Sequence, residues 1–548
     1  MATGGAIVVR SLVRWGVSHA FTVPGESFLG LLDALHDSRI RVVATRHEGG
    51  ASFMAEAFGS LTGKPAVCMA TRAVGAANLA IGLHTALQNS TPLLAIIGQV
   101  PRAARGREAF QEVDLVETIG GLCKAALEVA SADDLAEAVD ALLGMATSGR
   151  PGPVLLSVPE DVFDEEATAG PREPDPGFPW EPPSLDEASV ARVLEAVAAA
   201  SRPIIVAGSG IVRSGARDLL VRLAESLEVP VVAAWRRPDS FPNEHRLYLG
   251  MTGLGGPATV RGRMAEADLW LALGTRLSEL TTFDYELPAS GTRLIQVDLE
   301  PGFKGDRRQP DEVIAADLGA FLDLALGHTS AGTEVTSRRA QNDADRTAFL
   351  AASTPPAEEP SSPVNPAAVM HTLREHLPRG TILTIDAGNF GGWAARYLPV
   401  PVDGRFLGPT SGAMGYALPA AIASGLAEPD RTIVAMAGDG AFAMLMAEVE
   451  TAVREGIRLV AIVFDNGMYG TIRMHQEAAH PGRVVATDLG PIDFAAVAQA
   501  CGARGVRVNR DDQLDEAIGD ALHSDGVSIL HVRMDPRYLS VDQTLEDP

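Results

Sequence analysis

The sequence predicts an α/β protein made of three doubly wound parallel-sheet domains. Apolar, β-branched runs of strand length alternate with helical patterns along the chain. The 548 residues are too many for one core, because domains average ~150 residues. Two stretches rich in Pro and acidic residues, 166–187 and 328–365, are typical of linkers. They separate domains at 1–165, 188–327 and 366–548.

Apolar runs stopped by Pro, Gly or polar residues predict strands, and amphipathic or small-residue segments predict helices. In the first domain we expect strands at 21–23, 41–45, 66–70 and 93–97, and helices at 6–15, 28–35, 48–61 and 75–87. In the second we expect strands at 203–207, 229–234, 269–273 and 293–297, and a helix at 216–227. The third should begin with a helix near 366 and a strand at 381–385, and end with a strand at 528–532.

Composition disfavours several classes of partner. A net charge of −25 argues against nucleic acid and anionic membranes, and solubility explains the acidic excess. Cys68, Cys123 and Cys501 form no CxxC pair, which fits a reducing compartment better than a zinc site or disulfides. The N-terminal apolar segment contains arginines, unlike a signal peptide, and no apolar run reaches the ~18 residues of a membrane span. We therefore expect a soluble, cytoplasmic protein.

The stretch 433–470 carries the strongest chemical signal. An apolar strand ends in Gly438-Asp439-Gly440, a helical pattern follows, and a second apolar strand ends in Asp465-Asn466-Gly467. In a strand–helix–strand unit both polar clusters lie at the carboxyl edge of the sheet, where ligands bind. Asp439 and Asn466 offer oxygen ligands that suit Mg²⁺, which often keeps a phosphate oxygen as a further ligand. Glycines and the helix beginning at Ala441 favour a phosphate nearby.

The Gly-Asp-Gly motif, followed 27 positions after its Asp by Asn466, resembles the cofactor motif of thiamine diphosphate-dependent enzymes. The resemblance implies a pyrimidine-binding, a central and a diphosphate-binding domain, with thiamine diphosphate and Mg²⁺ as cofactors. It also implies that the backbone carbonyl of Met468 is a third metal ligand. Asp465 stands where the family usually has Asn, which changes the local charge and leaves the ligand set intact. An ordinary Gly-rich turn in a βαβ unit is the alternative for either motif alone.

The first domain offers Glu48 as the catalytic carboxyl group, in Arg46-His47-Glu48-Gly49-Gly50 after a predicted strand. The family's glutamate hydrogen-bonds the cofactor ring nitrogen N1′ and helps to form the C2 ylid, and an apolar pocket would raise its pKa. The alternative is a helix-initiating Glu stabilised by the helix dipole. Glu56 is the competing carboxylate, and we expect it to be a surface residue or a cap partner.

Two further segments match cofactor positions of the family. Asp386-Ala387-Gly388-Asn389-Phe390 follows a predicted strand, and Thr410–Gly415 precedes a helix in which Met414 would wedge between the two cofactor rings. A Gly-Asn turn and a core Met are the alternatives. The predicted cofactor-binding residues are Gly388, Asn389, Phe390, Gly412, Met414, Gly438, Gly440, Ala441, Asn466, Met468, Tyr469 and Gly470.

Across nearly the whole chain the sequence resembles the acetolactate (acetohydroxyacid) synthase branch. Matching segments include VPGESFLGLLDAL, GQVPRAARGREAFQEVD, LGMTGLGGPAT and DNGMYGTIRMHQE. The branch adds a 2-oxo acid to C2, releases CO₂ and transfers the resulting enamine fragment to a second carbonyl. By motif position, Phe110 and Gln111 would line the substrate channel. Arg276 would bind the second acid's carboxylate, unless it is a surface arginine.

The chain departs from this branch at the substrate and flavin positions. His475 stands where the biosynthetic enzymes have a Trp that selects the acceptor, and it is either a solvated residue or a contact to an unusual acceptor. Gly-Thr-Arg276-Leu lacks the second arginine and the Asp pair of the flavin-binding synthases, and Ala207–Gly210 is a weak dinucleotide signal. FAD is therefore doubtful.

Three alternatives remain: a simple 2-oxo acid decarboxylase or aldehyde lyase, a non-catalytic relative, and a nucleotide-binding dehydrogenase. No GxGxxG follows the first strand, which disfavours the dehydrogenase. Because Glu48 and Asp439 belong to different domains, the resemblance implies a site shared between subunits and hence a homodimer or homotetramer.

Overall fold

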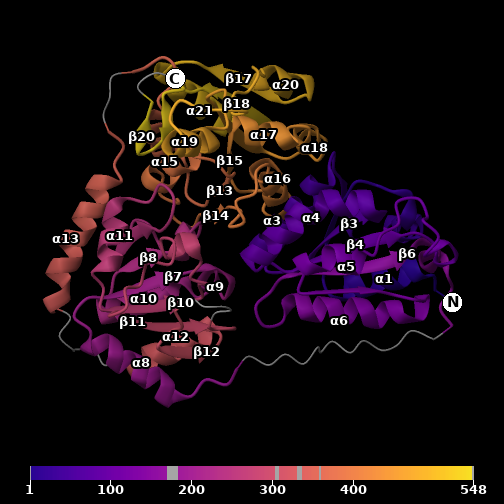
Figure 1. Cartoon of the computed structure of the whole chain (residues 1–548), viewed down its shortest axis with the longest axis horizontal. Coiled ribbons are helices and arrows are strands. Elements are labelled where there is room, and N and C mark those ends of the chain that lie inside the picture. Colours follow the sequence, from indigo (N-terminus) through magenta and orange to yellow (C-terminus); the bar gives the residue numbers. More distant parts are fainter. Residues whose placement is uncertain (1, 169–182, 303–307, 330–335, 357–359, 546–548) are drawn as a thin grey trace.

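A computed structural model describes residues 2–168, 183–302, 308–329, 336–356 and 360–545. The chain forms three six-stranded parallel sheets flanked by helices, as the sequence predicts (Figure 1). Most of the predicted 166–187 linker lies outside the described residues. The predicted 328–365 linker contains a helix, α13 (Thr336–Ala352), which runs along the second sheet domain and then leads to the third.

The first sheet has the strand order β2-β1-β3-β4-β6-β5. Apolar strands such as β4 are buried along their whole length, as expected when helices cover both faces. The strands are β1 (His19–Thr22), β2 (Arg41–Ala44), β3 (Ala66–Thr71), β4 (Leu93–Gln99), β5 (Ala125–Glu128) and β6 (Pro153–Pro159). The α-helices are α1 (Gly4–Arg14), α2 (Leu29–His36), α3 (Glu48–Thr62), α4 (Arg72–Asn89), α5 (Leu115–Ile119), α6 (Leu135–Thr147) and α7 (Glu160–Asp164).

The second sheet has the order β12-β11-β10-β7-β8-β9, in which the strand order reverses between β7 and β10. Its strands are β7 (Pro203–Ala207), β8 (Val231–Ala233), β9 (Tyr248–Met251), β10 (Leu269–Leu273), β11 (Arg293–Asp298) and β12 (Glu312–Ala315). Its α-helices are α8 (Glu187–Ala199), α9 (Ser209–Arg213), α10 (Arg217–Leu227), α11 (Ala258–Ala265) and α12 (Leu318–His328).

The third sheet, ordered β14-β13-β15-β16-β18-β17, repeats the topology of the first. The helical segment predicted after Asp439 is broken near Met446 into two helices, α17 and α18. The strands are β13 (Ile382–Ile385), β14 (Arg405–Leu407), β15 (Ile433–Gly438), β16 (Leu459–Asp465), β17 (Arg504–Val508) and β18 (Val527–Arg533). The α-helices are α14 (Pro366–His376), α15 (Phe390–Tyr397), α16 (Ala417–Ala427), α17 (Asp439–Leu445), α18 (Glu448–Arg454), α19 (Gly470–Ala479), α20 (Phe494–Ala500) and α21 (Leu514–His523). A small antiparallel pair, β19 (Tyr538–Ser540) and β20 (Gln543–Thr544), follows.

The first and third sheet domains share one hydrophobic core through α3 and α16 (Figure 1). Both helices are rich in Gly and Ala, which allows a close approach of their axes. Phe53 packs edge-on against Tyr416, with ring centroids 5.4 Å apart. This contact fixes the orientation of the two domains within one chain.

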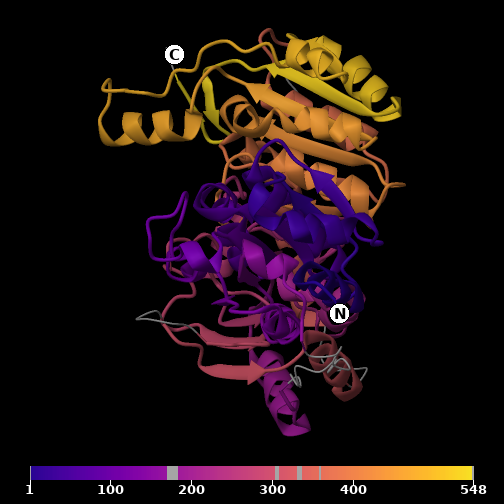
Figure 2. The same cartoon turned by 90° about the vertical axis from the view of Figure 1, so that its right-hand side faces the viewer.

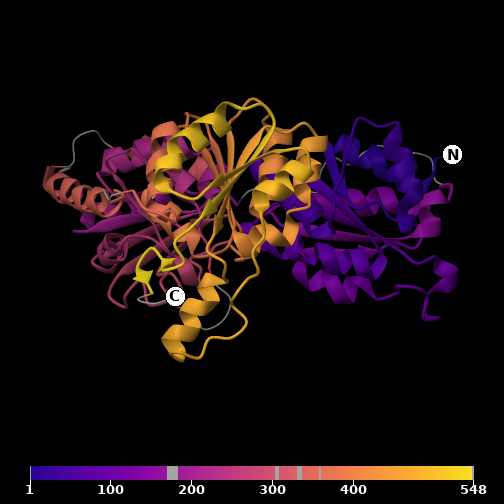
Figure 3. The same ribbon diagram turned by 90° about the horizontal axis from the view of Figure 1, so that it is seen from above.

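Helix α19 differs from the rest of the third domain because it extends away from the body (Figures 2 and 3). None of its residues is fully buried. No helix among the described residues has the length and apolar character needed to cross a membrane.

Candidate cofactor site

The predicted metal and diphosphate residues meet at the carboxyl edge of the third sheet. The strand order reverses between β13 and β15, and ligands bind at such switch points in open α/β sheets. The loops after these two strands touch, because a Cβ on Gly438 would lie 3.3 Å from the Phe390 ring. Gly388, in the first loop, has a φ of +149°, which only glycine adopts readily. The edge is therefore shaped for close approach of a ligand to the backbone.

Asp439 joins the two strand ends that the sequence motif predicted to be adjacent. Its Oδ1 accepts from the Gly440 N–H at 2.8 Å, and its Oδ2 accepts from the Gly467 N–H at 2.8 Å. The side chain is 7% exposed. Asn466 follows β16 directly and is half-buried, while Met468 is buried. The Asp439 carboxylate, the Asn466 side-chain amide and the Met468 backbone carbonyl thus lie in two neighbouring loops.

Burial raises the pKa of Asp439 to about 7, and the neighbouring Asp465 carboxylate adds to this shift. Burial also opposes ionisation of Asp465. However, the hydrogen bond with His531 and the charge of Arg533 outweigh burial, and the pKa of Asp465 falls below its usual value. Two buried carboxyl groups in one site repel each other, and a divalent cation would relieve that repulsion.

His531 is a residue of this site that the sequence analysis missed. Its Nε2 lies 2.7 Å from Asp465 Oδ2, and both side chains are buried. Asp465 Oδ1 accepts from the Gly467 N–H at 3.0 Å and so orders the loop that carries Asn466. A His within the apolar strand β18 was the available signal. Asp465 therefore holds the loop in place, in addition to changing the local charge relative to the family's usual Asn.

The side chains of Tyr469 and Asn389 lie at the carboxyl edge of the third sheet. A Cβ on Gly440 would lie 2.6 Å from the Tyr469 ring, so the ring packs directly on the glycine backbone. Asn389 donates to the Leu539 carbonyl at 2.8 Å and accepts from Thr471 Oγ1 at 2.9 Å. Phe390, which stays a predicted cofactor contact, is buried and stacks on Phe464 with ring centroids 5.4 Å apart. It therefore supports the loop from below.

The loop that contains Met414 is held by Asp386. The Asp386 carboxylate accepts from the N–H groups of Gly415 at 2.8 Å and Ala417 at 3.2 Å. Burial raises the pKa of Asp386 to about 6, although the backbone N–H donors act in the opposite direction. Met414 is half-buried, and Gly412 has a φ of +72°. The sequence named this aspartate only as part of its motif, and the contacts give it a positioning role.

Glu48 is the first residue of α3, as predicted, and is half-buried in the single chain. Its Oε2 accepts from Asn78 Nδ2 of α4 at 2.9 Å. The loop before it is held across the domain boundary, since Glu448 Oε1 accepts the N–H groups of Arg46 and His47 at 3.0 and 3.1 Å. Glu448 is fully buried, and burial raises its pKa. Neither Asn78 nor Glu448 was singled out by the sequence.

The expectation for Glu56 was wrong. Glu56 is fully buried instead of lying at the surface, and it accepts hydrogen bonds from Asn89 Nδ2 at 2.9 Å, Thr91 Oγ1 at 2.7 Å and Tyr416 Oη at 2.6 Å. Its neighbours in α3 are small residues, which suggested exposure when the partner helix α16 was unknown. The three donors satisfy the buried carboxylate and connect the first domain to the third.

The predicted substrate residues lie in separate places within the chain. Phe110 is 71% exposed, and Gln111 has a φ of +65°. Arg276 Nη1 donates to the carbonyls of Leu87 and Gln88 at the end of α4, at 3.0 and 3.2 Å. His475 is exposed on α19. Among the described residues no hydrogen bond or ion pair connects Glu48, Phe110 or Gln111 with the Asp439 site.

Three family models match the chain in order. They are the thiamine pyrophosphate enzyme N-terminal TPP binding domain at residues 2–118, the central domain at 190–324 and the C-terminal TPP binding domain at 386–532. Similar relatives include the acetolactate synthase large subunit of Parasynechococcus marenigrum, 32% identical over 97% of this chain and 87% of the relative. The acetolactate synthase isozyme 2 large subunit of Escherichia coli is 30% identical over 97% and 95%, respectively. The acetolactate synthase large subunit of Corynebacterium glutamicum is 30% identical over 95% and 84%.

Proposed function

The chain belongs to the thiamine pyrophosphate enzymes, and we propose that it is a carboligase of the acetolactate synthase type. It would decarboxylate a 2-oxo acid and transfer the remaining fragment to the carbonyl group of a second small molecule. Thiamine diphosphate, when bound, supplies the electron sink for the decarboxylation. The single observation that carries the proposal is Asp439, which is buried and hydrogen-bonded across both strand ends.

The residues at the third sheet edge fit a diphosphate with Mg²⁺. The donor set of Asp439, Asn466 and the Met468 carbonyl is all oxygen, as Mg²⁺ prefers. Burial and the neighbouring Asp465 raise the pKa of Asp439, and a divalent cation beside it would stabilise the ionised carboxylate. Glycines at 438 and 440, with the start of α17, would leave backbone N–H groups for the phosphates. We assign Mg²⁺ to this edge on those grounds.

Glu48 would hold and move a proton at the pyrimidine ring of the cofactor. Its carboxyl group is positioned by the hydrogen bond from Asn78 and by the hydrogen bonds that Glu448 accepts from the preceding loop. Met414, on the loop ordered by Asp386, would support the bend of the cofactor. Glu48 is half-buried in one chain, so the apolar pocket expected around it requires a second surface.

A second copy of the chain would supply that surface. Exposed apolar side chains lie on the elements that carry or adjoin the predicted site residues, and monomeric proteins rarely expose such sets. They are Val74 and Ile81 on α4, Phe110, Met444 on α17 and Ile472 on α19. We propose a homodimer, or a tetramer of two dimers, in which Glu48 of one chain faces Asp439 of the other. The three unpaired cysteines favour a cytoplasmic location.

The second sheet gives little support for FAD. Its switch point lies between β7 and β10, where a dinucleotide phosphate would meet the Gly208-Ser209-Gly210 turn. The Gly208 N–H donates to the Leu273 carbonyl at 2.9 Å and the Gly210 N–H to the Gly274 carbonyl at 3.0 Å. A Cβ on Gly208 would lie 2.3 Å from the Gly274 oxygen. These glycines serve strand packing, and we infer that activity does not require the flavin.

The test is incubation of the protein with thiamine diphosphate, Mg²⁺ and a panel of 2-oxo acids, with and without added aldehydes. Mass spectrometry should detect a ligation product, such as acetolactate from pyruvate, and the rate should not change when FAD is added. An aldehyde as the sole product would instead favour a simple decarboxylase. His475, which is exposed, stands where the biosynthetic enzymes have the Trp that selects the acceptor. The panel of aldehydes therefore tests which acceptor this chain uses.

A further inference from the structure

The side chain of Asn89, the last residue of α4, makes hydrogen bonds to all three domains of the chain. Its Nδ2 donates to Glu56 Oε1 in the first domain at 2.9 Å. Its Oδ1 accepts from Arg237 Nη2 in the second domain at 2.8 Å. The same oxygen accepts from Thr410 in the third domain, from the N–H at 3.1 Å and from Oγ1 at 2.7 Å. Asn89 is 7% exposed, so these contacts are shielded from water.

The partners of Asn89 fix the orientation of its amide group. A guanidinium and a backbone N–H only donate hydrogen bonds, so Arg237 and Thr410 require the amide oxygen. The Glu56 carboxylate accepts, so it requires the amide nitrogen. A flipped amide would place donors against donors and an acceptor against an acceptor. Because buried polar groups without partners are costly, the network has one favourable arrangement.

One face of α4 holds the loop 410–415, which precedes α16. Thr85 and Asn89 are four residues apart and therefore lie on the same face of the helix. Thr85 is fully buried, and its Oγ1 is hydrogen-bonded to Ser411 Oγ at 2.9 Å. The start of the loop is thus bound to the first domain. Its end is bound to the third sheet through Asp386, which accepts from the last N–H of the loop.

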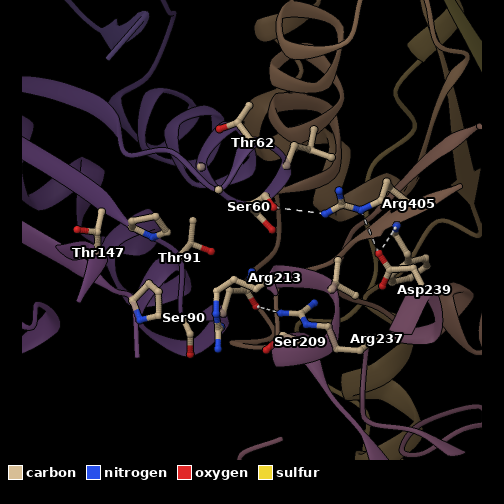
Figure 4. A pocket seen from close by; sticks show the side chains of 18 residues that line it. Ser60, Thr62, Ser90, Thr91, Thr147, Ser209, Arg213, Arg237, Asp239 and Arg405 are labelled. Carbon is tan, nitrogen blue, oxygen red and sulfur yellow. Dashed lines mark hydrogen bonds and ion pairs between the residues drawn. The ribbon is translucent and has the colours of Figure 1, made fainter. Parts of the chain in front are cut away.

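The second domain contacts the same end of α4. Arg276 donates to the Leu87 and Gln88 carbonyls, and Arg237 brings a second guanidinium to Asn89. Figure 4 shows the Arg237 side chain reaching toward the residues at this end of α4, with its hydrogen bond drawn as a dashed line. Positive groups are favourable there, because the carboxyl-terminal end of a helix carries a partial negative charge. The second domain therefore helps to hold Asn89 in place.

We propose that Asn89 is a positioning residue, which sets the place of the loop 410–415 and hence of Met414 in the cofactor site. The inference rests on the proposed function, in which Met414 supports the bend of the cofactor. Asn89 acts through Thr410 and does not touch the cofactor itself. Displacing a supporting group by ~1 Å lowers rates by up to about 10²-fold. Binding of the diphosphate belongs to the separate edge around Asp439 and should not depend on Asn89.

The first experiment measures hydrogen–deuterium exchange at C2 of thiamine diphosphate, in full-length protein saturated with the cofactor and Mg²⁺. Asn89→Ala should slow this exchange roughly tenfold to a hundredfold, because the loop loses its hydrogen bonds to the amide. The affinity for thiamine diphosphate should stay within a few fold of wild type. The near-ultraviolet circular dichroism of the bound cofactor should change, since its bend is no longer supported.

Asn243→Ala is the matched control. Asn243 is also buried, and its Oδ1 accepts from the Val400 N–H at 2.9 Å across the boundary between the second and third domains. Both alanine variants should unfold at a lower temperature than wild type, but Asn243→Ala should keep the wild-type rate of C2 exchange. A wild-type rate in Asn89→Ala, or an equal loss in the two variants, would overturn the inference.

A paired substitution tests the network itself. Asn89→Asp keeps an oxygen for Arg237 and Thr410 but places a second carboxylate against Glu56, and their repulsion should slow C2 exchange. Adding Glu56→Gln supplies an amide that can donate to the new carboxylate, and it restores the net charge of the network. The double variant should therefore return to near the wild-type rate. A double variant as slow as Asn89→Asp would contradict the assigned network.

Amide hydrogen exchange of the cofactor-free protein separates this inference from the proposed function. In Asn89→Ala, peptides that cover 408–416 should exchange roughly tenfold faster than in wild type, while peptides from β15 and β16 stay protected. A wild-type protein that does not bind thiamine diphosphate would refute the proposed function, and loop exchange would then decide the role of Asn89. Unchanged protection of the loop would overturn the inference even if the cofactor binds normally.

Discussion

The first and third sheet domains have the same strand order but carry different functional groups at corresponding positions. In chain order, the third strand of each sheet is followed by Arg72 in the first domain and by Asp439 in the third. After the second strand, the first domain places Glu48 at the head of α3, whereas the third places the Met414 loop before α16. The shared fold thus supplies matching edges, and individual residues decide what each edge binds.

The difference assigns a separate task to each domain. In the proposed function, the third domain would hold a cation through its oxygen ligands, and the first would present the Glu48 carboxyl group to a cofactor ring. The corresponding helices α3 and α16 pack against each other within the chain. In the proposed dimer, the half-site of each domain would face a partner domain from another copy.

Glu48→Gln should lower turnover by roughly 10²–10⁴-fold, the range for losing a group that transfers protons. The amide keeps the size of the side chain but cannot hold or move a proton at the cofactor ring. Affinity for thiamine diphosphate should stay within a few fold, because the proposed diphosphate contacts lie in the third domain. Turnover and hydrogen–deuterium exchange at the cofactor C2 measure the two effects. Undiminished turnover would remove Glu48 from the mechanism.

Asp439→Asn should weaken Mg²⁺-dependent binding of thiamine diphosphate by roughly 10²-fold, because a charged ligand of the cation is lost. The variant should retain the fold, since Asn can still accept from the Gly440 or Gly467 N–H. Equilibrium dialysis across a Mg²⁺ titration provides the measurement, with Asp525→Asn, an exposed residue just before β18, as a control. Unchanged affinity would show that the metal lies elsewhere.

Cofactor binding should also depend on pH in a defined direction. Burial and Asp465 raise the pKa of Asp439 to about 7, so the free protein carries a proton there below that pH. The proton must leave when a cation binds, and affinity should fall about tenfold per pH unit below pH 7 and level off above it. Calorimetry in buffers of different ionisation enthalpy would report the released proton. A flat affinity between pH 6 and 8 would contradict this coupling.

Glu448→Ala should slow C2 exchange by roughly tenfold to a hundredfold, since a shift of about 1 Å at a reacting group has effects of that size. The substitution leaves the Arg46 and His47 N–H groups without their acceptor and loosens the loop before Glu48. Glu448→Gln retains an acceptor and should restore the exchange rate. Cofactor affinity should be unchanged in both variants. Equal exchange rates in Glu448→Ala and wild type would assign Glu448 to folding alone.

Tyr416→Phe should have the smallest effect, a loss of about 1–3 kcal/mol in the free energy of unfolding. The change removes one of three hydrogen bonds to the buried Glu56 carboxylate and leaves its Oε2 without that donor. Urea denaturation measures it, and turnover per folded molecule should be preserved. A wild-type unfolding free energy would show that another group replaces the tyrosine donor.

The amino-acid sequence was sufficient to predict the local features of the fold and of the candidate site. Strand–turn–helix patterns predict three parallel sheets, and the spacing from Asp439 to Asn466 places both at one edge, as observed. Contacts between segments that lie far apart in the sequence could not be predicted from it. The partner helix α16 buries Glu56, and Glu448 reaches the Glu48 loop 400 positions away in sequence. His531 meets Asp465 because β16 and β18 are neighbours, which periodicity alone does not show.

The most direct test of the divided site mixes two inactive proteins. Glu48→Gln and Asp439→Ala chains are unfolded together, refolded and assayed for turnover. In a mixed dimer one site carries both substitutions, while the other combines the intact Glu48 and Asp439 of different chains. About a quarter of wild-type activity should be recovered, because half of randomly paired dimers are mixed and each has one intact site. No recovery, with mixed dimers confirmed by mass spectrometry, would contradict the claim that two chains share each site.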